Sequence, residues 1–132
     1  MRRLHDERGS AVVEFSLISV LLLMLLFAVL QVAALFYVRS VAAAAAADGA
    51  RYAANADVGP SAGADRASEL IGRGLGPAMA ARLPCTGRLV SDPASNLQVS
   101  QVQCQGRMNS VLLPLGAFVQ VRVTGQSLKD QP

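Results

Sequence analysis

The chain has 132 residues, of which 52% are hydrophobic, and it carries a formal net charge of +3 at neutral pH. This modest charge forms no Lys/Arg cluster interleaved with aromatic residues, which argues against nucleic acid as a partner. One histidine and two cysteines cannot supply the three or four His and Cys ligands of a zinc site. We therefore expect no metal, no cofactor and no small-molecule substrate.

An uninterrupted apolar run dominates the first third of the chain. Between Phe15 and Val38 there is no charged residue, no glycine and no proline. In a helix, which rises about 1.5 Å per residue, this run covers the roughly 30 Å hydrocarbon core of a bilayer. Backbone groups must be satisfied inside lipid, so a single spanning segment has to be helical. Tyr37 and Arg39 are typical of anchors at the membrane–water interface. The sequence thus predicts a single-pass membrane protein.

The polar N-terminus predicts the orientation of that helix. Residues 1–8, MRRLHDER, contain three arginines, and basic residues beside a membrane segment favour the cytoplasmic side. Arg39 and Arg51 beyond the run weaken this bias without reversing it. We expect a cytoplasmic N-terminus and an extracytoplasmic C-terminal region.

A secretory signal peptide is a competing interpretation of a basic leader followed by an apolar run. Its apolar region usually has about 7–15 residues and is followed closely by small residues at the cleavage site. The run here is longer and ends in Phe-Tyr-Val-Arg at residues 36–39, whereas the alanines of residues 42–47 come later. Cleavage after the apolar run is therefore a minority alternative, and an ordinary, unprocessed membrane N-terminus is another.

The sequence GSAVVEF at residues 9–15 resembles the type IV prepilin signature, in which a short basic leader ends in glycine and a Glu-Phe pair follows the cut. With its long helix, alanine-rich continuation and small two-cysteine domain, the chain resembles the TadE-like pseudopilins of tight-adherence (Flp-type) pili. The resemblance covers residues 9 to about 56 closely and is only general beyond them. It implies cleavage between Gly9 and Ser10 and residence in the cytoplasmic membrane. It also implies three partners: a prepilin peptidase, other pilin or pseudopilin subunits, and the inner-membrane assembly platform.

The position of Glu14 indicates a role in subunit assembly. Glu14 lies four residues after Ser10, about one helical turn, so both share a face. If the leader is removed, Ser10 carries a free ammonium group. An ionised carboxylate placed towards the bilayer centre costs several kcal/mol unless paired, and a neighbouring subunit's Ser10 ammonium would pair with it and set the axial register. The alternative is a Glu14 that snorkels to the cytoplasmic headgroups. Ser10, Glu14 and Phe15 are the candidate assembly residues.

The composition changes from Leu and Val to Ala in residues 40–57. Alanine is the best helix former, and Gly49 weakens the helix by roughly 1 kcal/mol without ending it. Asp48 is expected to pair with Arg51 across one turn. The Val-Gly-Pro of residues 58–60 ends the helix, so the membrane segment and its continuation form one rod of about 70 Å. Its polyalanine face either lets another helix approach closely or is simply solvated.

A second, shorter helix is predicted at the start of residues 61–83. Apolar residues recur there at three- and four-residue spacing from Ala64 to Ile71. Glycines at 72, 74 and 76, followed by Pro77, are expected to break this helix into a loop. The glycine-rich stretch follows a helix rather than a strand and lacks a Gly-Lys-Ser/Thr ending, so it is not a phosphate-binding loop.

The remaining residues predict antiparallel strands. Residues 85–91 and 97–104 flank a Ser-Asp-Pro-Ala-Ser-Asn turn signal. Folding the hairpin about the middle of that turn places Cys85 opposite Cys104, where a disulfide is geometrically plausible. Two cysteines beyond a membrane segment also favour a disulfide in an oxidising compartment.

Further along the chain, one strand is clearly indicated. Valines at 119, 121 and 123 alternate with polar residues, which is typical of a half-buried strand. Val111 to Leu113 is a candidate for an additional strand. Residues 127–132 are predicted to be a polar tail.

Together these elements predict an α+β protein. A long N-terminal transmembrane helix continues into an extracytoplasmic Ala-rich helix, followed by a short helix and a small antiparallel β-sheet domain stapled by one disulfide. The expected domains are a leader (residues 1–9), the transmembrane and extended helix (residues 10–58) and the small α+β domain (residues 59–132).

The first functional hypothesis is a minor pseudopilin or assembly subunit of a tight-adherence pilus or a related secretion machine. The family's major pilins are small and lack a sizeable globular domain, so this chain resembles a minor subunit. The alternative is a single-pass membrane anchor that presents a surface binding module and does not polymerise. An enzyme ranks third, because no nucleophile–base pair or metal set is visible beyond the membrane.

Overall fold

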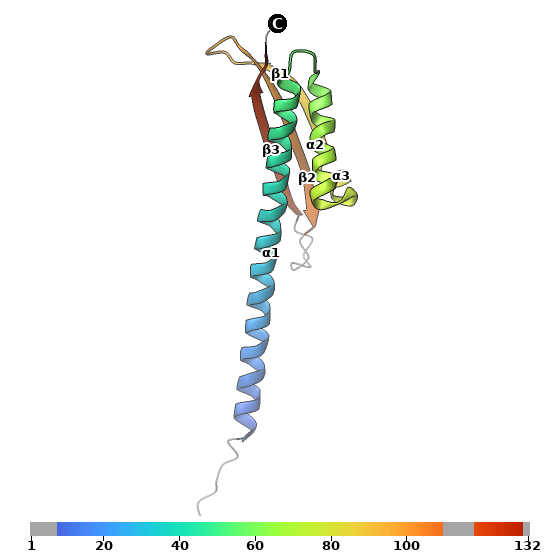
Figure 1. The fold of residues 1–132 in the computed structure, drawn as a ribbon. Coiled ribbons are helices and arrows are strands. Elements are labelled where there is room, and N and C mark those ends of the chain that lie inside the picture. Colours follow the sequence, from blue (N-terminus) through green and yellow to red (C-terminus); the bar gives the residue numbers. More distant parts are fainter. Residues whose placement is uncertain (1–7, 110–117, 131–132) are drawn as a thin grey trace, which may run out of the picture.

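The computed structural model describes residues 8–109 and 118–130. A 47-residue helix carries a small domain of helices and strands around its C-terminal part. The elements in chain order are α1 (Arg8–Ala54), α2 (Pro60–Leu75), α3 (Pro77–Arg82), β1 (Cys85–Ser91), β2 (Gln98–Asn109) and β3 (Phe118–Leu128) (Figure 1). The predicted fold class, with a long apolar helix, short helices and a disulfide-linked antiparallel sheet, is confirmed.

The first helix is continuous from the apolar run into the alanine-rich stretch, and Gly49 does not interrupt it. It ends at Ala54, three residues before the expected end, and carbonyl groups on both sides of this end are bound by a side chain from the end of the described chain. Lys129 Nζ donates hydrogen bonds to the backbone oxygens of Ala53, Asn55 and Val58 at 3.0, 2.5 and 2.7 Å. A cation at this end also interacts favourably with the helix dipole.

The prediction of a polar tail after residue 127 is therefore wrong for its first residues. β3 extends to Leu128, Lys129 binds the end of α1 as described above, and the Asp130 N–H donates to Ala54 O at 2.8 Å. The end of the described chain is thus attached to the end of the first helix.

The prediction that the glycines after residue 71 form a loop is also wrong. Gly72 and Gly74 lie inside α2, and only Gly76 ends it, with φ of +91°. α3 begins immediately, at Pro77. A glycine within a helix costs only about 1 kcal/mol, and Gly74 faces α1 so closely that an added Cβ would lie 2.8 Å from Val41 Cγ1. Tertiary packing therefore overrides the local signal.

The strands form a three-stranded antiparallel sheet in the order β1-β2-β3. The predicted hairpin register is confirmed, with Cys85 opposite Cys104 and Val90 opposite Val99. β2 continues five residues beyond the expected end. In β3, Val121 and Val123 are buried, as the alternating pattern predicted, whereas Val119, at the start of the strand, is exposed. The additional strand expected at residues 111–113 lies outside the described residues.

Asp92 organises the hairpin turn. Its carboxylate accepts hydrogen bonds from Ser95 Oγ at 2.8 Å and from the Ala94 N–H at 3.2 Å. These bonds favour the ionised form, so they lower the pKa of Asp92 below its ordinary value. Asn96 follows with φ of +54°, a conformation that Asn tolerates better than most residues.

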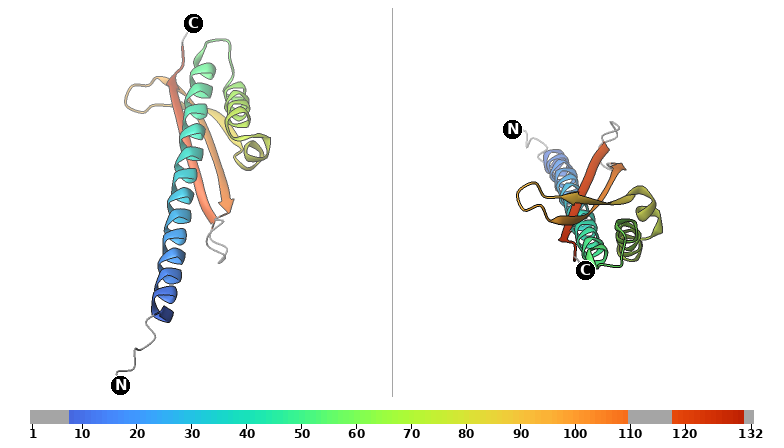
Figure 2. Two further views of the ribbon diagram at one scale, coloured as in Figure 1. Left: turned by 60° about the horizontal axis from the view of Figure 1, so that its bottom comes forward. Right: turned by 90° about the horizontal axis from the view of Figure 1, so that it is seen from above.

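The core lies between one face of the sheet and two helices, α2 and the C-terminal part of α1 (Figure 2). The core therefore includes residues from both sides of the expected boundary between the extended helix (residues 10–58) and the small domain (residues 59–132). Its buried members are mostly small or aliphatic: Val38, Ala42, Ala45, Ala46, Ala50, Ala67, Ile71, Leu83, Val102, Cys104, Val121 and Val123.

Candidate functional site

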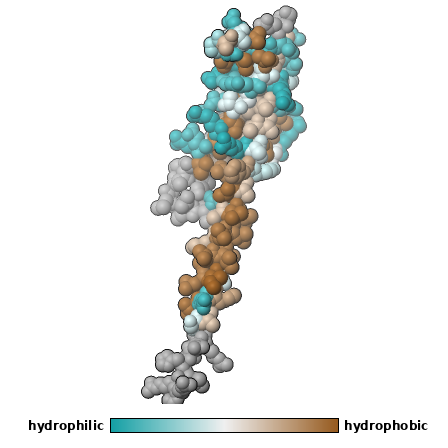
Figure 3. All heavy atoms as spheres, turned by 90° about the vertical axis from the view of Figure 1, so that its left-hand side faces the viewer, coloured by the Kyte–Doolittle hydropathy of each residue, from teal (hydrophilic) through white to brown (hydrophobic). Residues whose placement is uncertain are grey.

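The part of α1 nearest the N-terminus, residues 10–37, is bare, and we call it the bare segment. No side chain between Ser10 and Tyr37 is buried, and Phe15 and Phe36 are 72% and 66% exposed. Figure 3 shows this segment as a brown, hydrophobic column below a largely hydrophilic domain. Soluble monomers rarely expose a contiguous apolar surface of this extent. By length and composition the helix can cross a membrane, which fits a single-pass membrane protein.

The candidate assembly residues lie at the start of this segment. α1 begins at Arg8, so the predicted cut between Gly9 and Ser10 falls in its first turn. Glu14 is exposed one turn further on. Among the side chains that the structure describes, those of residues 10–108 and 119–130, no basic group forms an ion pair with it. Nearby Ser16, in contrast, is satisfied, because its hydroxyl donates to Val12 O at 2.8 Å. Glu14 is therefore a carboxylate on an apolar surface that has no counter-ion in the described part of its own chain.

The rest of α1, residues 38–54, packs against the domain, and we call it the packed segment. Its alanine face is covered by α2 and the sheet. A Cβ atom on Gly49 would come closer than 3.0 Å to Gly63 O, and one on Gly125 would come closer than 3.0 Å to Ala46 O. Of the two alternatives for the polyalanine face, solvation or close approach of another helix, the structure shows the second, and that helix is α2 of the same chain.

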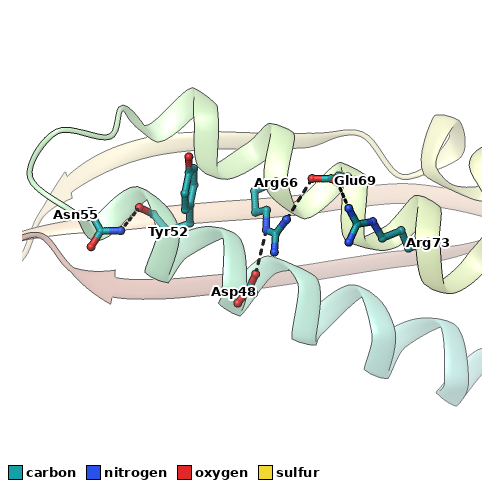
Figure 4. Close-up of polar contacts among 6 residues, drawn as sticks. All are labelled: Asp48, Tyr52, Asn55, Arg66, Glu69 and Arg73. Carbon is teal, nitrogen blue, oxygen red and sulfur yellow. Dashed lines mark hydrogen bonds and ion pairs between the residues drawn. The ribbon is translucent and has the colours of Figure 1, made fainter.

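An open, polar groove runs between the exposed sides of α1 and α2. It encloses about 650 Å³, and its lining includes Tyr52 and Arg66. Arg66 pairs with Asp48 at 3.4 Å and with Glu69 at 3.3 Å, and Glu69 also pairs with Arg73 (Figure 4). The expected pairing of Asp48 with Arg51 is wrong.

The groove shows no arrangement typical of catalysis. Its ion pairs are solvent-exposed, so each contributes at most about 1 kcal/mol. Among the side chains that the structure describes, no three His, Cys, Asp or Glu residues lie close enough to hold a metal ion. The i,i+3 and i,i+4 spacing of Arg66, Glu69 and Arg73 was visible in the sequence. Nothing local could have indicated the contact with Asp48.

The predicted disulfide is present. Cys85 on β1 is bonded to Cys104 on β2, with Cα atoms 4.0 Å apart. Cys104 is completely buried, so the bridge fastens the hairpin at the sheet face that contacts the helices.

A comparison with known protein families found a match within α1, the helix that carries Glu14 and the bare and packed segments. The family model described as TadE-like protein matches residues 9–51. This segment is TadE-like. The match spans the bare segment and most of the packed segment, and it confirms the resemblance seen in the sequence. No curated protein and no solved structure matches the chain. The match suggests involvement in a tight-adherence pilus system, and the TadE-like family is a structural, non-enzymatic kind of protein.

Proposed function

We propose that the chain is a minor pseudopilin or assembly subunit of a tight-adherence (Flp-type) pilus or a related secretion machine. In this proposal a prepilin peptidase cuts between Gly9 and Ser10. The mature chain then spans the cytoplasmic membrane with its N-terminus inside. The inner-membrane assembly platform and other pilin subunits are its partners. The observation that carries the proposal is Glu14, a carboxylate on a bare apolar helix one turn after the cut, with no counter-ion among the side chains that the structure describes.

Electrostatics gives Glu14 its role. In lipid, an ionised carboxylate needs a counter-charge, and cleavage creates one at the N-terminus of each mature subunit. The ammonium group of a neighbour's Ser10 pairs with Glu14 and fixes the axial offset between two helices. The same chain's Ser10 lies one turn away and competes for this carboxylate, so the contact has to be measured between chains.

The remaining parts of the chain fit the same arrangement. Residues 1–9 are the leader, residues 10–58 the transmembrane and extended helix, and residues 59–132 the extracytoplasmic domain, to which the packed segment contributes core residues. The Cys85–Cys104 disulfide supports an oxidising compartment for this domain.

A second candidate function is a single-pass anchor that presents a binding module and does not polymerise. The α1–α2 groove favours it, because about 650 Å³ of open space lined by both signs of charge could receive a polar ligand or partner. This alternative requires neither cleavage nor a contact at Glu14.

The mature N-terminus separates the two functions. We expect the chain, expressed with its cognate prepilin peptidase, to lose residues 1–9, and Gly9→Leu to block the cut, because a side chain would then occupy a site that suits glycine. Ala11→Leu adds similar bulk two residues away and serves as the control that is still cut. Intact-mass measurement identifies each product. A wild-type chain that keeps Met1 or Arg2 beside an active peptidase would overturn the pseudopilin proposal.

A further inference from the structure

A cleft opens where α1 leaves the sheet, at the border between the bare and packed segments. It has a volume of about 300 Å³ and lies between α1 and the edge strand β3. Leu35, Phe36 and Arg39 line it from the helix, and residues 119–122 line it from the strand. We call it the junction cleft.

The lining of the junction cleft combines apolar and cationic groups. Leu35, Phe36 and the two valines of β3 are its apolar lining residues, and Arg39 and Arg122 are its cationic lining residues. Both arginines are exposed, and within the described ranges neither forms an ion pair with a carboxylate. Two uncompensated cations beside apolar side chains match an anionic, amphipathic ligand.

Charge is distributed unevenly along the domain. Arg107 on β2 lies opposite Gln120 on β3, two residues along the strand from Arg122, so this end of the sheet carries a further cationic residue. The opposite end of the domain, around the end of α1 and the β1–β2 turn, carries Lys129 together with three carboxylates: Asp57, Asp92 and Asp130. The positive end is the one from which the bare segment projects.

The length of the bare segment places this end at the membrane surface. Residues 15–36 span about 33 Å as a helix, close to the roughly 30 Å of the hydrocarbon core. Tyr37 and Arg39 therefore fall at the level of the phospholipid headgroups, as does the cleft that Arg39 lines.

We infer that the junction cleft binds an anionic phospholipid of the membrane that α1 spans. Arg39 and Arg122 hold the headgroup phosphate, and the acyl chains run along Leu35 and Phe36 onto the bare segment. The inference rests on the membrane insertion in the proposed function, and it requires neither cleavage nor polymerisation. Continuity between the cleft's apolar wall and the bare segment favours a lipid over free phosphate.

The test uses the full, uncleaved chain in nanodiscs made of phosphatidylcholine alone or of phosphatidylcholine mixed with phosphatidylglycerol. Native mass spectrometry after release measures how much of each lipid the protein retains. We expect preferential retention of phosphatidylglycerol, and a roughly tenfold or larger loss of that preference in Arg39→Gln/Arg122→Gln, because the two cationic residues that line the cleft are removed. Arg51→Gln/Arg88→Gln removes the same net charge away from the cleft and should retain the preference.

Three results would overturn the inference. They are no preference in the wild type, equal loss in both double variants, and displacement of the lipid by inorganic phosphate alone, which would make the cleft a site for free anions. The mature N-terminus is scored separately, by intact mass in cells. A failure of lipid binding and a failure of the pseudopilin proposal are thus distinguishable.

Discussion

The bare and packed segments of α1 share one continuous backbone but carry different side chains. The bare segment is rich in Leu, Val and Phe and buries none of them, whereas the packed segment is mostly alanine and buries one face. The change begins about one helical turn before Val38: Leu35 is half-buried and packs against the core, and Val38, on the same face, is only 7% exposed.

This difference shows that the size of the side chains along α1 depends on whether lipid or protein backbone contacts the helix. Lipid chains adapt to a surface of large apolar side chains, so close contacts do not limit the size of the side chains in the bare segment. Protein backbone does not adapt in this way, and the contacts at Gly49 and Gly125 require almost no side chain at all. Variants in the two segments should therefore fail in different ways.

The largest effect is expected from Glu14→Ala in the bare segment, which should abolish assembly and leave the domain folded. Insertion should be unimpaired, because a carboxylate leaves the membrane run, and the cut site four residues away is intact. Glu14→Gln should fail nearly as badly, because it keeps the shape and removes the charge. The measurement is crosslinking to other pilins, with cleavage and membrane level followed in parallel.

Ser16→Ala is the matched control for Glu14, because the Ser16 hydroxyl bonds only within its own helix. It should assemble normally. If both Glu14 variants crosslink and support piliation like the wild type, Glu14 is a snorkelling residue, and the single-pass anchor becomes the better hypothesis.

The next effect, confined to the packed segment and its domain, is expected from Cys85→Ala/Cys104→Ala. The bridge closes a loop of about twenty residues, so its loss should lower the free energy of unfolding by about 3 kcal/mol. Chemical denaturation in micelles measures the loss, and limited proteolysis should cut the domain while the bare segment stays protected. Free thiols at both positions, trapped by alkylation directly in cells, would contradict the disulfide.

A smaller effect comes from two identical substitutions of helical glycines. Gly49→Ala should destabilise the domain by about 1–3 kcal/mol, because its Cβ collides with Gly63 O. Gly72→Ala should stabilise it by roughly 0.5–1 kcal/mol, because its Cβ meets only Ala80 Cβ at 3.7 Å and glycine is unfavourable in helices. Denaturation midpoints in micelles decide the signs. Stabilisation by both would mean that α1 and α2 are further apart than described.

The smallest expected effect is a pH dependence of stability that comes from Asp92 in the hairpin turn, far from the bare segment. The pKa of Asp92 is lowered in the folded state from an ordinary value of 3.8, so its ionised form stabilises the turn at neutral pH. This contribution is fully present above the unfolded pKa and is lost as the pH falls through the lower, folded pKa. Asp92→Asn should remove that part of the acid sensitivity. Unfolding curves between neutral pH and about pH 3 test it, and identical profiles would exclude the role.

Much of the fold was predictable because its signals are local. The apolar run specifies a helix by length alone, and the turn residues between two cysteines at matching distances specify the β1–β2 register. Alternation of valines specifies the buried side of β3. The candidate residues Gly9, Ser10, Glu14 and Phe15 could be named for the same reason, since their motif is contiguous.

What sequence reasoning missed depends on contacts between distant segments. Asp48 has a cation three residues away in Arg51, yet it pairs with Arg66 on α2, because only the packing of two helices brings them together. Lys129 gave no sign that it would bind the end of α1 more than seventy positions earlier. Arg122 read as one polar residue in an alternating strand, and its place in the junction cleft depends on where α1 departs from the sheet.

The uninterrupted backbone of α1 has a mechanical consequence. No hinge lies between Glu14 and Val38, and these 24 residues make about 6.7 helical turns. The direction in which Glu14 points is therefore tied to the orientation of the sheet some 36 Å away. Rotation of the domain by a partner turns the carboxylate by the same angle, and an axial pull on the domain is transmitted undiminished to the membrane end. The domain at one end of α1 and Glu14 at the other therefore move as one rigid unit.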